Sequence, residues 1–266
     1  MQSPTYETLI EQLPVSVYGS NEEMGRAAAA EAADVIKRAI DERGEANVIL
    51  ATGNSQLTFL QALRENHDVE WSQVRVFHMD EYVGLDPEHP ASFPLFLHRH
   101  FLDYVTVAAF YPVEAPTEAT EKACQTYERL LRHHPADLCA CGIGENGHLA
   151  FNDPPYADFD DPVWVKVVQL DERSRRQQVG EGHFGSLDEV PTHAVTLTIP
   201  ALLAAGRVLC IVPEARKADA VQDALHGPIT EDCPASILRT QPHARLYLDP
   251  DSGSLVDWET GKLVDW

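Results

Sequence analysis

The sequence has little positive charge. Its 20 Lys and Arg residues are outnumbered by 42 Asp and Glu residues, and the 266-residue chain has a formal net charge of −22 at pH 7. This excess of acid argues against a general affinity for nucleic acid or for an anionic membrane surface, because both would repel the chain. A local positive pocket remains compatible with the composition, so a small anionic ligand is not excluded.

Long apolar runs and a regular cysteine pattern are also missing. No stretch is long enough to span a bilayer, and residues 1–10 contain neither the basic nor the apolar segment of a signal peptide, which predicts a cytoplasmic protein. The cysteines are scattered and odd in number: Cys124, Cys139, Cys141, Cys210 and Cys233. Two of them lie too close together for an ordinary zinc knuckle, so we expect buried, reduced thiols and no metal site.

Apolar strand patterns alternate with amphipathic helix patterns along the whole chain. Strands are expected at 47–52, 74–79, 137–143, 163–170, 193–199, 207–213 and 244–248. Helices are expected at 20–44, 55–66, 92–105, 117–133 and 215–225. This alternation predicts a Rossmann-like α/β fold, with a doubly wound, mostly parallel sheet covered by helices on both faces. No shift in composition separates two halves, so residues 1–266 are expected to form a single domain.

The C-terminal segment contains a short repeat. SLVDW at 254–258 returns as KLVDW at 262–266. The two copies are too short for a solenoid and predict a hairpin or an edge contact.

In such sheets, ligands bind in the crevice at the carboxyl ends of the strands. Thr52, Gly53, Asn54 and Ser55 lie between a predicted strand and the next helix, where free backbone N–H groups and the helix dipole favour a phosphate. The Gly-Lys-Ser/Thr ending of a Walker loop is missing. An ordinary helix cap remains the alternative.

Charged residues follow two further strands. Asp80 and Glu81 come directly after the strand at 74–79, where a partly desolvated carboxylate can take a proton from carbon next to a carbonyl. Lys217 follows the strand at 207–213 and can meet a phosphate as a point charge. The alternatives are a solvated acidic loop and a surface lysine.

The run from Gly142 to Gly147 matches the Gly-x-Gly-x-x-Gly fingerprint of a dinucleotide site. Asp171, which ends the next predicted strand, keeps that alternative open. It is the weaker one, because Pro154 and Pro155 prevent a long helix from following the glycines.

Polar side chains in and after this glycine turn suggest proton transfer instead. Glu145, Asn146 and His148 lie in the turn, and Asn152 and Asp153 follow it. A histidine close to carboxylates can accept and return a proton near neutral pH.

Together these stretches resemble the glucosamine-6-phosphate deaminase family, within a wider group that includes 6-phosphogluconolactonases. The resemblance covers nearly the whole chain and is most specific in MDEYVGLDPEHPAS, which begins at Met79, and GIGENGHLAFND, which begins at Gly142. It implies conversion of glucosamine 6-phosphate to fructose 6-phosphate and ammonia in amino-sugar catabolism, without a metal or organic cofactor. The implied partner is a small sugar phosphate, and self-association is left open.

The resemblance also implies roles for individual residues. Asp80 would move the proton from C2 to C1, His148 would act on the ring oxygen during ring opening, and Asp153 would support His148. The residues implied to contact the substrate, most of them at its phosphate, are Thr52, Gly53, Asn54, Ser55, Glu81, Gly144 and Lys217.

The chain departs from the family pattern in three places. Asn146 stands where well-known members have an Asp, and an amide can only orient His148 or bond a sugar hydroxyl. Asp153 is one methylene shorter than the usual Glu. The segment RSRRQQVGEGHF has no clear counterpart of a phosphate-binding Arg, for which Arg175 and Arg176 are the candidates.

Two rivals to the deaminase hypothesis therefore stay open. One is a sugar-phosphate lactonase in which His148 activates water, which Asp80 and the AFND continuation at 150–153 disfavour. The other is a sugar-phosphate sensor that has kept the pocket and lost the chemistry.

Overall fold

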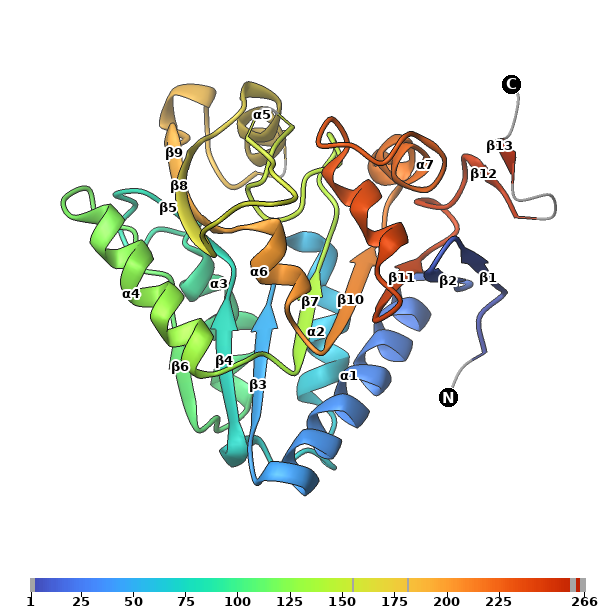
Figure 1. Cartoon of the computed structure of the whole chain (residues 1–266), viewed down its shortest axis with the longest axis horizontal. Coiled ribbons are helices and arrows are strands. Elements are labelled where there is room, and N and C mark those ends of the chain that lie inside the picture. Colours follow the sequence, from blue (N-terminus) through green and yellow to red (C-terminus); the bar gives the residue numbers. More distant parts are fainter. Residues whose placement is uncertain (1–2, 155, 181, 259–261, 264–266) are drawn as a thin grey trace.

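The computed structural model describes residues 3–154, 156–180, 182–258 and 262–263. Its centre is an eight-stranded sheet with the strand order β1-β2-β11-β10-β7-β3-β4-β6 (Figure 1). The strands are β1 (Tyr6–Ile10), β2 (Leu13–Val17), β3 (Ala46–Leu50), β4 (Val74–His78), β6 (Ala109–Tyr111), β7 (Leu138–Cys141), β10 (Arg207–Val212) and β11 (Ala244–Leu248). Neighbours pair in parallel, except for the antiparallel hairpin of β1 and β2. The predicted mostly parallel α/β fold is confirmed.

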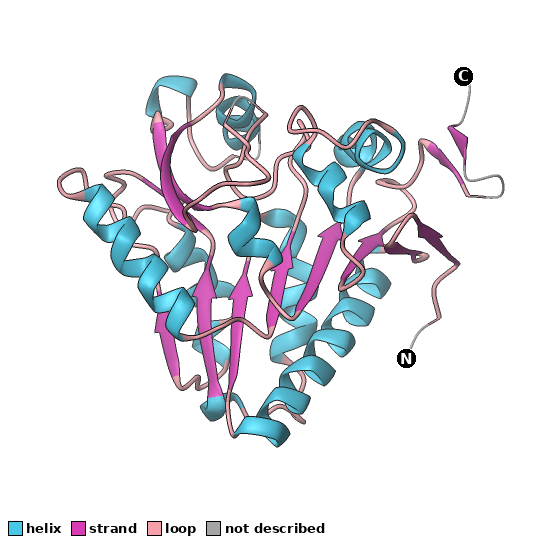
Figure 2. Cartoon of the chain, in the orientation of Figure 1, coloured by secondary structure: helices cyan, strands magenta, loops and turns pink. Residues whose placement is uncertain are grey.

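Helices cover both faces of this sheet (Figure 2). One face carries α1 (Asn21–Arg43), α2 (Leu57–Arg64) and α3 (Phe93–His100), and the other carries α4 (Thr120–His133) and α6 (Ile199–Leu203), while α7 (Ala218–His226) lies at the carboxyl end of the sheet. Each face has its own buried cluster. The first cluster includes Ile36, Phe59 and Val48, and the second includes Leu131, Leu202 and Cys139. Strands buried on both faces explain the continuous apolar runs in the sequence.

Helix α1 begins and ends where its capping residues predict. The Ser20 hydroxyl accepts a hydrogen bond from the Glu23 backbone N–H at 3.2 Å, and Gly44 ends the helix with φ 79°. Its buried face is rich in alanine, which lets the helix approach the sheet closely. Among the residues that the structure describes, no helix combines the length and apolar character needed to cross a membrane.

Two predicted strands lie outside the large sheet. β8 (Val165–Gln169) and β9 (His193–Leu197) pair in antiparallel fashion with each other, and β9 pairs with β5 (Asp80–Tyr82). We expected them among the parallel strands. The sequence of β8 fits the observed position better, because its residues vary between buried and exposed, as in a sheet with one open face.

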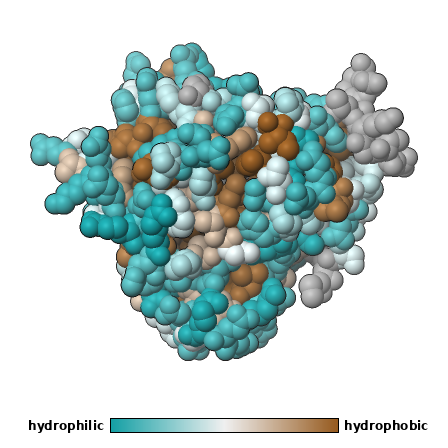
Figure 3. All heavy atoms as spheres, in the orientation of Figure 1, coloured by the Kyte–Doolittle hydropathy of each residue, from teal (hydrophilic) through white to brown (hydrophobic). Residues whose placement is uncertain are grey.

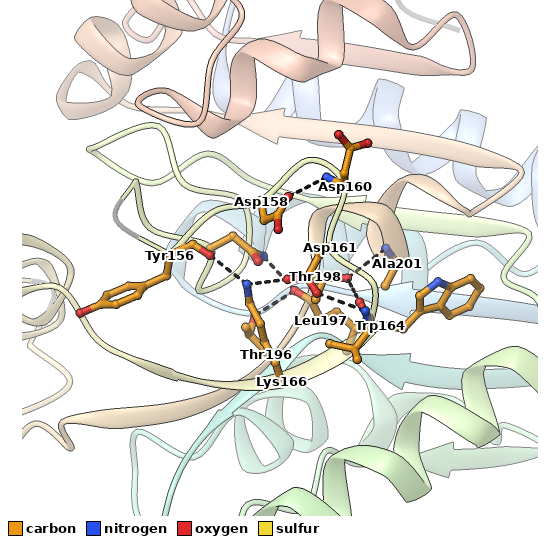
Figure 4. Close-up of polar contacts among 12 residues, drawn as sticks. Tyr156, Asp158, Asp160, Asp161, Trp164, Lys166, Thr196, Leu197, Thr198 and Ala201 are labelled. Carbon is orange, nitrogen blue, oxygen red and sulfur yellow. Dashed lines mark hydrogen bonds and ion pairs between the residues drawn. The ribbon is translucent and has the colours of Figure 1, made fainter.

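The segment after the glycine turn is tied to this smaller sheet. In Figure 4, Lys166 of β8 donates to the Tyr156 carbonyl at 2.8 Å and pairs with Asp161 at 2.6 Å. The Thr196 hydroxyl accepts a hydrogen bond from the Phe151 N–H at 3.0 Å. The chain on both sides of Pro154 is therefore anchored close to the strand ends.

The C-terminal repeat forms the predicted hairpin where it is described. β12 (Val256–Asp257) pairs with β13 (Lys262–Leu263), while 264–266 of the second copy lie outside the described residues. Trp258 also packs against Tyr6 of β1, with ring centroids 5.5 Å apart. The first copy thus makes an edge contact as well.

Most of the molecular face in Figure 3 is hydrophilic, and apolar atoms gather mainly in its upper half. The carboxyl ends of β3, β4, β7 and β10 point toward that end of the molecule. There α5 (Glu172–Gly180), α7 and the three-stranded sheet stand above the strand ends (Figure 1). This arrangement creates the crevice in which the predicted site residues meet.

Candidate functional site

Residues that follow four parallel strands line a single cleft. The predicted residues among its walls are Thr52, Gly53, Asn54, Ser55, Asp80, Gly144, His148 and Lys217. The empty space, including the solvent-open mouth, is about 780 Å³. A volume of this order suits a small molecule.

The loop after β3 is fixed to β10, which is separated from β3 by β7 in the sheet. Gly53 has φ 94°, a conformation that favours glycine, and a short 3-10 helix (Asn54–Gln56) follows it before α2. Gln56 is buried, and its Nε2 donates to the Ile211 carbonyl of β10 at 3.2 Å. The loop therefore holds its hydroxyl and amide groups at the cleft wall.

Lys217 brings a positive charge into this acidic chain. It ends the 3-10 helix Ala215–Lys217, which follows β10, and is only 3% exposed. It lines the same cleft as the 52–55 loop. An ammonium and a polar loop in one cleft make a candidate phosphate site.

Neither arginine candidate lines the cleft. Arg175 donates to the carbonyl oxygens of Leu187 and Val190, at 2.6 and 2.9 Å. Arg176 pairs with Glu172 on the surface, with 66% of its side chain exposed. The expectation that one of them replaces the family's phosphate-binding Arg is therefore not supported.

Other side chains from this segment do reach the cleft. Gln177, Gln178 and His183 line the cleft, and the sequence analysis did not single them out. The two glutamines lie three and four residues after Ser174 on α5, a spacing that shares one helix face. This periodicity was the available signal, but no motif marked the segment as part of the site.

Asp80 is a buried carboxyl group at the start of β5, two residues after β4 ends. It is 7% exposed, and burial, helped by the neighbouring Glu81 carboxylate, raises the pKa of Asp80 to about 8. Near neutral pH this group can exist both with and without a proton. It is therefore suited to proton transfer.

Glu81 does not line this cleft. Its carboxylate accepts hydrogen bonds from the Tyr82 N–H at 2.8 Å, and from the Ser92 hydroxyl and the Phe93 N–H at 3.1 Å each. Burial nevertheless raises the pKa of Glu81 to about 7. The predicted substrate contact is thus replaced by a link to the start of α3, where Phe93 forms part of the cleft wall.

The glycine turn supports a histidine and not a dinucleotide. A Cβ atom on Gly144 would overlap the His148 ring, so only glycine lets the ring lie there. Gly147 has φ 83° and begins no helix, and in the described residues that follow it the next α-helix is α5. The helix that a pyrophosphate site requires is not at this turn.

His148 belongs to a cluster of four polar side chains. Its Nδ1 lies 2.9 Å from Oδ1 of Asp153, which is fully buried. The Asn146 amide donates to the same oxygen at 2.9 Å, and the Ser174 hydroxyl donates to it at 2.5 Å. The shorter Asp153 side chain therefore reaches His148. Asn146 and Asp153 stand behind the histidine and do not line the cleft.

Asp153 behaves differently from Asp80. Burial by itself would raise the pKa of Asp153, but the His148 ring and the three hydrogen bonds hold it well below its usual range. A permanent carboxylate beside Nδ1 favours the tautomer with the proton on that nitrogen, which leaves Nε2 as the acceptor. His148 can then exchange a proton with a ligand in the cleft.

Among the described residues, no group of three or more His, Cys, Asp and Glu side chains is placed to hold a metal ion.

Sequence comparisons place these features in a family. A family model described as glucosamine-6-phosphate isomerases/6-phosphogluconolactonase matches residues 19–247. The glucosamine-6-phosphate deaminase of Bacillus pumilus is 34% identical over 247 residues, which covers 90% of this chain and 98% of that protein. The enzyme of the same name from Lactobacillus delbrueckii subsp. bulgaricus is 33% identical over 227 residues, with coverages of 85% and 93%.

Solved structures agree with the sequence relatives. A monomeric glucosamine-6-phosphate deaminase matches with a TM-score of 0.82 at 29% identity, over 91% of this chain and 99% of that one. The 6-phosphogluconolactonase of Trypanosoma brucei matches with a TM-score of 0.74 at 17% identity, over 94% and 99% of the two chains, and shares the fold. The chain belongs to the glucosamine-6-phosphate isomerase/6-phosphogluconolactonase family.

Proposed function

We propose that this protein is a glucosamine-6-phosphate deaminase, which converts glucosamine 6-phosphate and water to fructose 6-phosphate and ammonia in amino-sugar catabolism. The observation that carries the proposal is that Asp80 and His148 line the same cleft as Lys217 and the 52–55 loop. Relatives with that name, at 33% and 34% identity, support the choice of substrate.

The phosphate would bind between the 52–55 loop and Lys217. The loop offers hydroxyl, amide and backbone N–H donors, and the lysine supplies the charge. Binding at this end would place the sugar ring toward Asp80 and His148.

His148 would open the ring. Its Nε2 takes the proton of the C1 hydroxyl and returns a proton to the ring oxygen as the C1–O bond to that oxygen breaks. The proton on Nδ1 stays on the Asp153 side. The open aldehyde makes the C2 proton acidic.

Asp80 would then carry the isomerisation. As a carboxylate it takes the C2 proton, which gives an enolate across C1 and C2, and as a carboxylic acid it returns this proton to C1. The C1 oxygen gains a proton as the amino nitrogen loses one, which leaves a C1 hydroxyl and an imine at C2. Water adds to this imine, and ammonia departs as the C2 carbonyl of fructose 6-phosphate forms. An acid with a pKa of about 8 can hold the proton between the two steps.

A lactonase reaction would not require Asp80. Hydrolysis of a lactone needs an activated water and moves no proton from carbon, so a buried acid at Asp80 would have no assigned step. The likeness to solved lactonases supports the fold alone at 17% identity.

The test is release of ammonia and fructose 6-phosphate from glucosamine 6-phosphate, with 6-phosphogluconolactone as a parallel substrate. Equal release of both products, and no lactone hydrolysis above background, is the expected result. Lactone hydrolysis without ammonia would contradict the proposal. Binding of the sugar phosphate without turnover of either substrate would also contradict it and would favour a sensor.

A further inference from the structure

The cluster behind His148 includes a residue for which the proposed reaction gives no role. Ser174, on the first turn of α5, is 3% exposed. Its hydroxyl donates to Oδ1 of Asp153 at 2.5 Å and lies 3.2 Å from Nδ1 of His148. It therefore touches both members of the His–carboxylate pair without lining the cleft.

Oδ1 of Asp153 is the point on which the cluster converges. The His148 ring, the Asn146 amide and the Ser174 hydroxyl all approach this one oxygen, within 2.9 Å. The other oxygen is approached by the Asp171 backbone N–H at a longer distance, 3.4 Å. A carboxylate only accepts hydrogen bonds, so each partner at Oδ1 has to be a donor.

We propose that Ser174 and Asn146 are positioning residues that fix the Asp153 carboxylate, and through it the His148 ring, in the orientation needed for ring opening. This inference rests on the proposed function of the cleft. Neither residue contacts the substrate in this scheme. Each acts by holding the oxygen that orients His148.

The proposal explains why an amide stands at position 146. Asn146 donates to Asp153, and its Oδ1 also accepts the His148 backbone N–H at 3.3 Å. A carboxylate at 146 would bring two like charges within about 3 Å of each other and would remove one donor. Asn146 and Asp153 thus form a matched pair of one amide and one carboxylate, and introducing the Asp of well-known members at position 146 is expected to impair the enzyme.

The first experiment compares Ser174→Ala with a matched control, Ser16→Ala. Ser16 is also buried, and its hydroxyl also donates to a carboxylate, that of Glu7 at 3.3 Å, but it lies in the N-terminal hairpin away from the cleft. Alanine favours helix, so α5 should form in the Ser174 variant. We expect kcat for ammonia release to fall about 10-fold to 100-fold in Ser174→Ala, with KM within about 2-fold, and no change in the control.

A spectroscopic signature separates positioning from a general loss of structure. Nitrogen-15 NMR of the histidine rings reports which nitrogen of His148 carries the proton. Wild type is expected to show Nδ1 protonated and Nε2 free, and Ser174→Ala is expected to show a mixture of the two tautomers. The Ser16 control should match wild type.

The second experiment exchanges the matched pair. Asn146→Asp is expected to lower kcat more than Ser174→Ala does, because it adds a like charge as well as removing a donor. The double variant Asn146→Asp, Asp153→Asn again contains one amide and one carboxylate, and should recover part of the loss. Asn146→Asp as active as wild type would overturn the proposal.

The proposed function of the cleft and the positioning role of Ser174 can be refuted separately. A wild-type protein that releases no ammonia refutes the proposed function, while the tautomer measurement still decides the positioning role. Normal ammonia release combined with an unchanged kcat and an unchanged tautomer in Ser174→Ala refutes the positioning role alone.

Discussion

Two buried aspartates, Asp80 in the cleft wall and Asp153 behind His148, have opposite electrostatic surroundings. Asp80 is 7% exposed and Asp153 is fully buried, so burial by itself acts to raise the pKa of each carboxyl group. At Asp80 no hydrogen bond from a described residue offsets this effect, and Glu81 adds a second negative charge. At Asp153 the charge of the His148 ring and hydrogen bonds from three donors, His148, Asn146 and Ser174, more than offset it.

This difference indicates which carboxyl group orients the histidine and which one transfers a proton. A group held as a permanent anion can orient a histidine and balance its charge, whereas a group that titrates near neutral pH can accept and return a proton. The neighbouring side chains thus divide two chemically identical residues into an orienting group and a proton-transfer group.

The largest expected effect is that of Asp80→Asn, which removes the proton acceptor. Ammonia release should fall by about 10²-fold to 10⁴-fold. The free energy of unfolding of the variant should also exceed that of wild type at pH 9, by an amount on the order of a few kcal/mol. At pH 4 this difference should be smaller. The reason is that the raised pKa makes ionised Asp80 destabilise the folded state, a cost that grows as pH rises toward 8.

Steady-state assays and urea unfolding at both pH values measure these two effects. Asp103→Asn, at an exposed surface aspartate, serves as the control. Full activity in Asp80→Asn would show that another group moves the C2 proton.

Asp153→Asn should have the next largest effect, because it removes the permanent anion beside His148. We expect kcat to fall about 10²-fold with little change in KM, since the residue lies behind the histidine and not at the substrate. Inhibition constants for inorganic phosphate, measured alongside, should stay at the wild-type value. A change in phosphate binding that accounts for the lost activity would show that Asp153 acts on the phosphate site and not through His148.

A smaller effect concerns the pH dependence of kcat/KM. Asp80 must be ionised to take the C2 proton, so kcat/KM should rise with pH through about 8 and then level off. Glu81→Gln removes the second cause of the raised pKa of Asp80 and should move this rise to lower pH, by about 0.5 to 1 unit. Glu88→Gln, on the exposed loop before α3, is the matched control. A rise that stays in place would mean that the Glu81 charge does not act on Asp80.

The smallest expected effect is that of Arg176→Ala. Because this side chain is 66% exposed and pairs with Glu172 on the surface, KM for the sugar phosphate should stay within about 2-fold of wild type. Lys217→Ala is the positive control and should raise KM about 10-fold or more. A comparable rise in Arg176→Ala would show that the arginine reaches the phosphate when substrate binds.

Much of the fold follows from local sequence patterns. Buried parallel strands appear as continuous apolar runs, and Ser20 and Gly44 mark the ends of α1. The position of β8 and β9 in a separate sheet could not be predicted in the same way, because short strands have similar patterns in either sheet. Their pairing is decided by long-range contacts, such as the hydrogen bond from the Leu197 N–H to the Met79 carbonyl.

The site was predictable in so far as it consists of residues that directly follow strands. Asp80, Lys217 and the 52–55 loop are of this kind, and the structure brings them to one cleft. Ser174 lies on a helix more than 20 residues after His148 in the sequence, and nothing local indicates that its hydroxyl reaches Asp153. Likewise, only the folded structure shows that Glu81 turns toward α3 while Asp80 faces the cleft.

Carbon-13 NMR of the aspartate carboxyl groups tests the contrast between the two aspartates most directly. In protein labelled at these carbons, Asp80→Asn and Asp153→Asn assign the two resonances. The expected result is that the Asp80 signal titrates near pH 8, while the Asp153 signal remains that of a carboxylate between pH 5 and 9. An Asp80 signal that is already ionised at pH 5, or an Asp153 signal that titrates near neutral pH, would contradict the assignment of their roles.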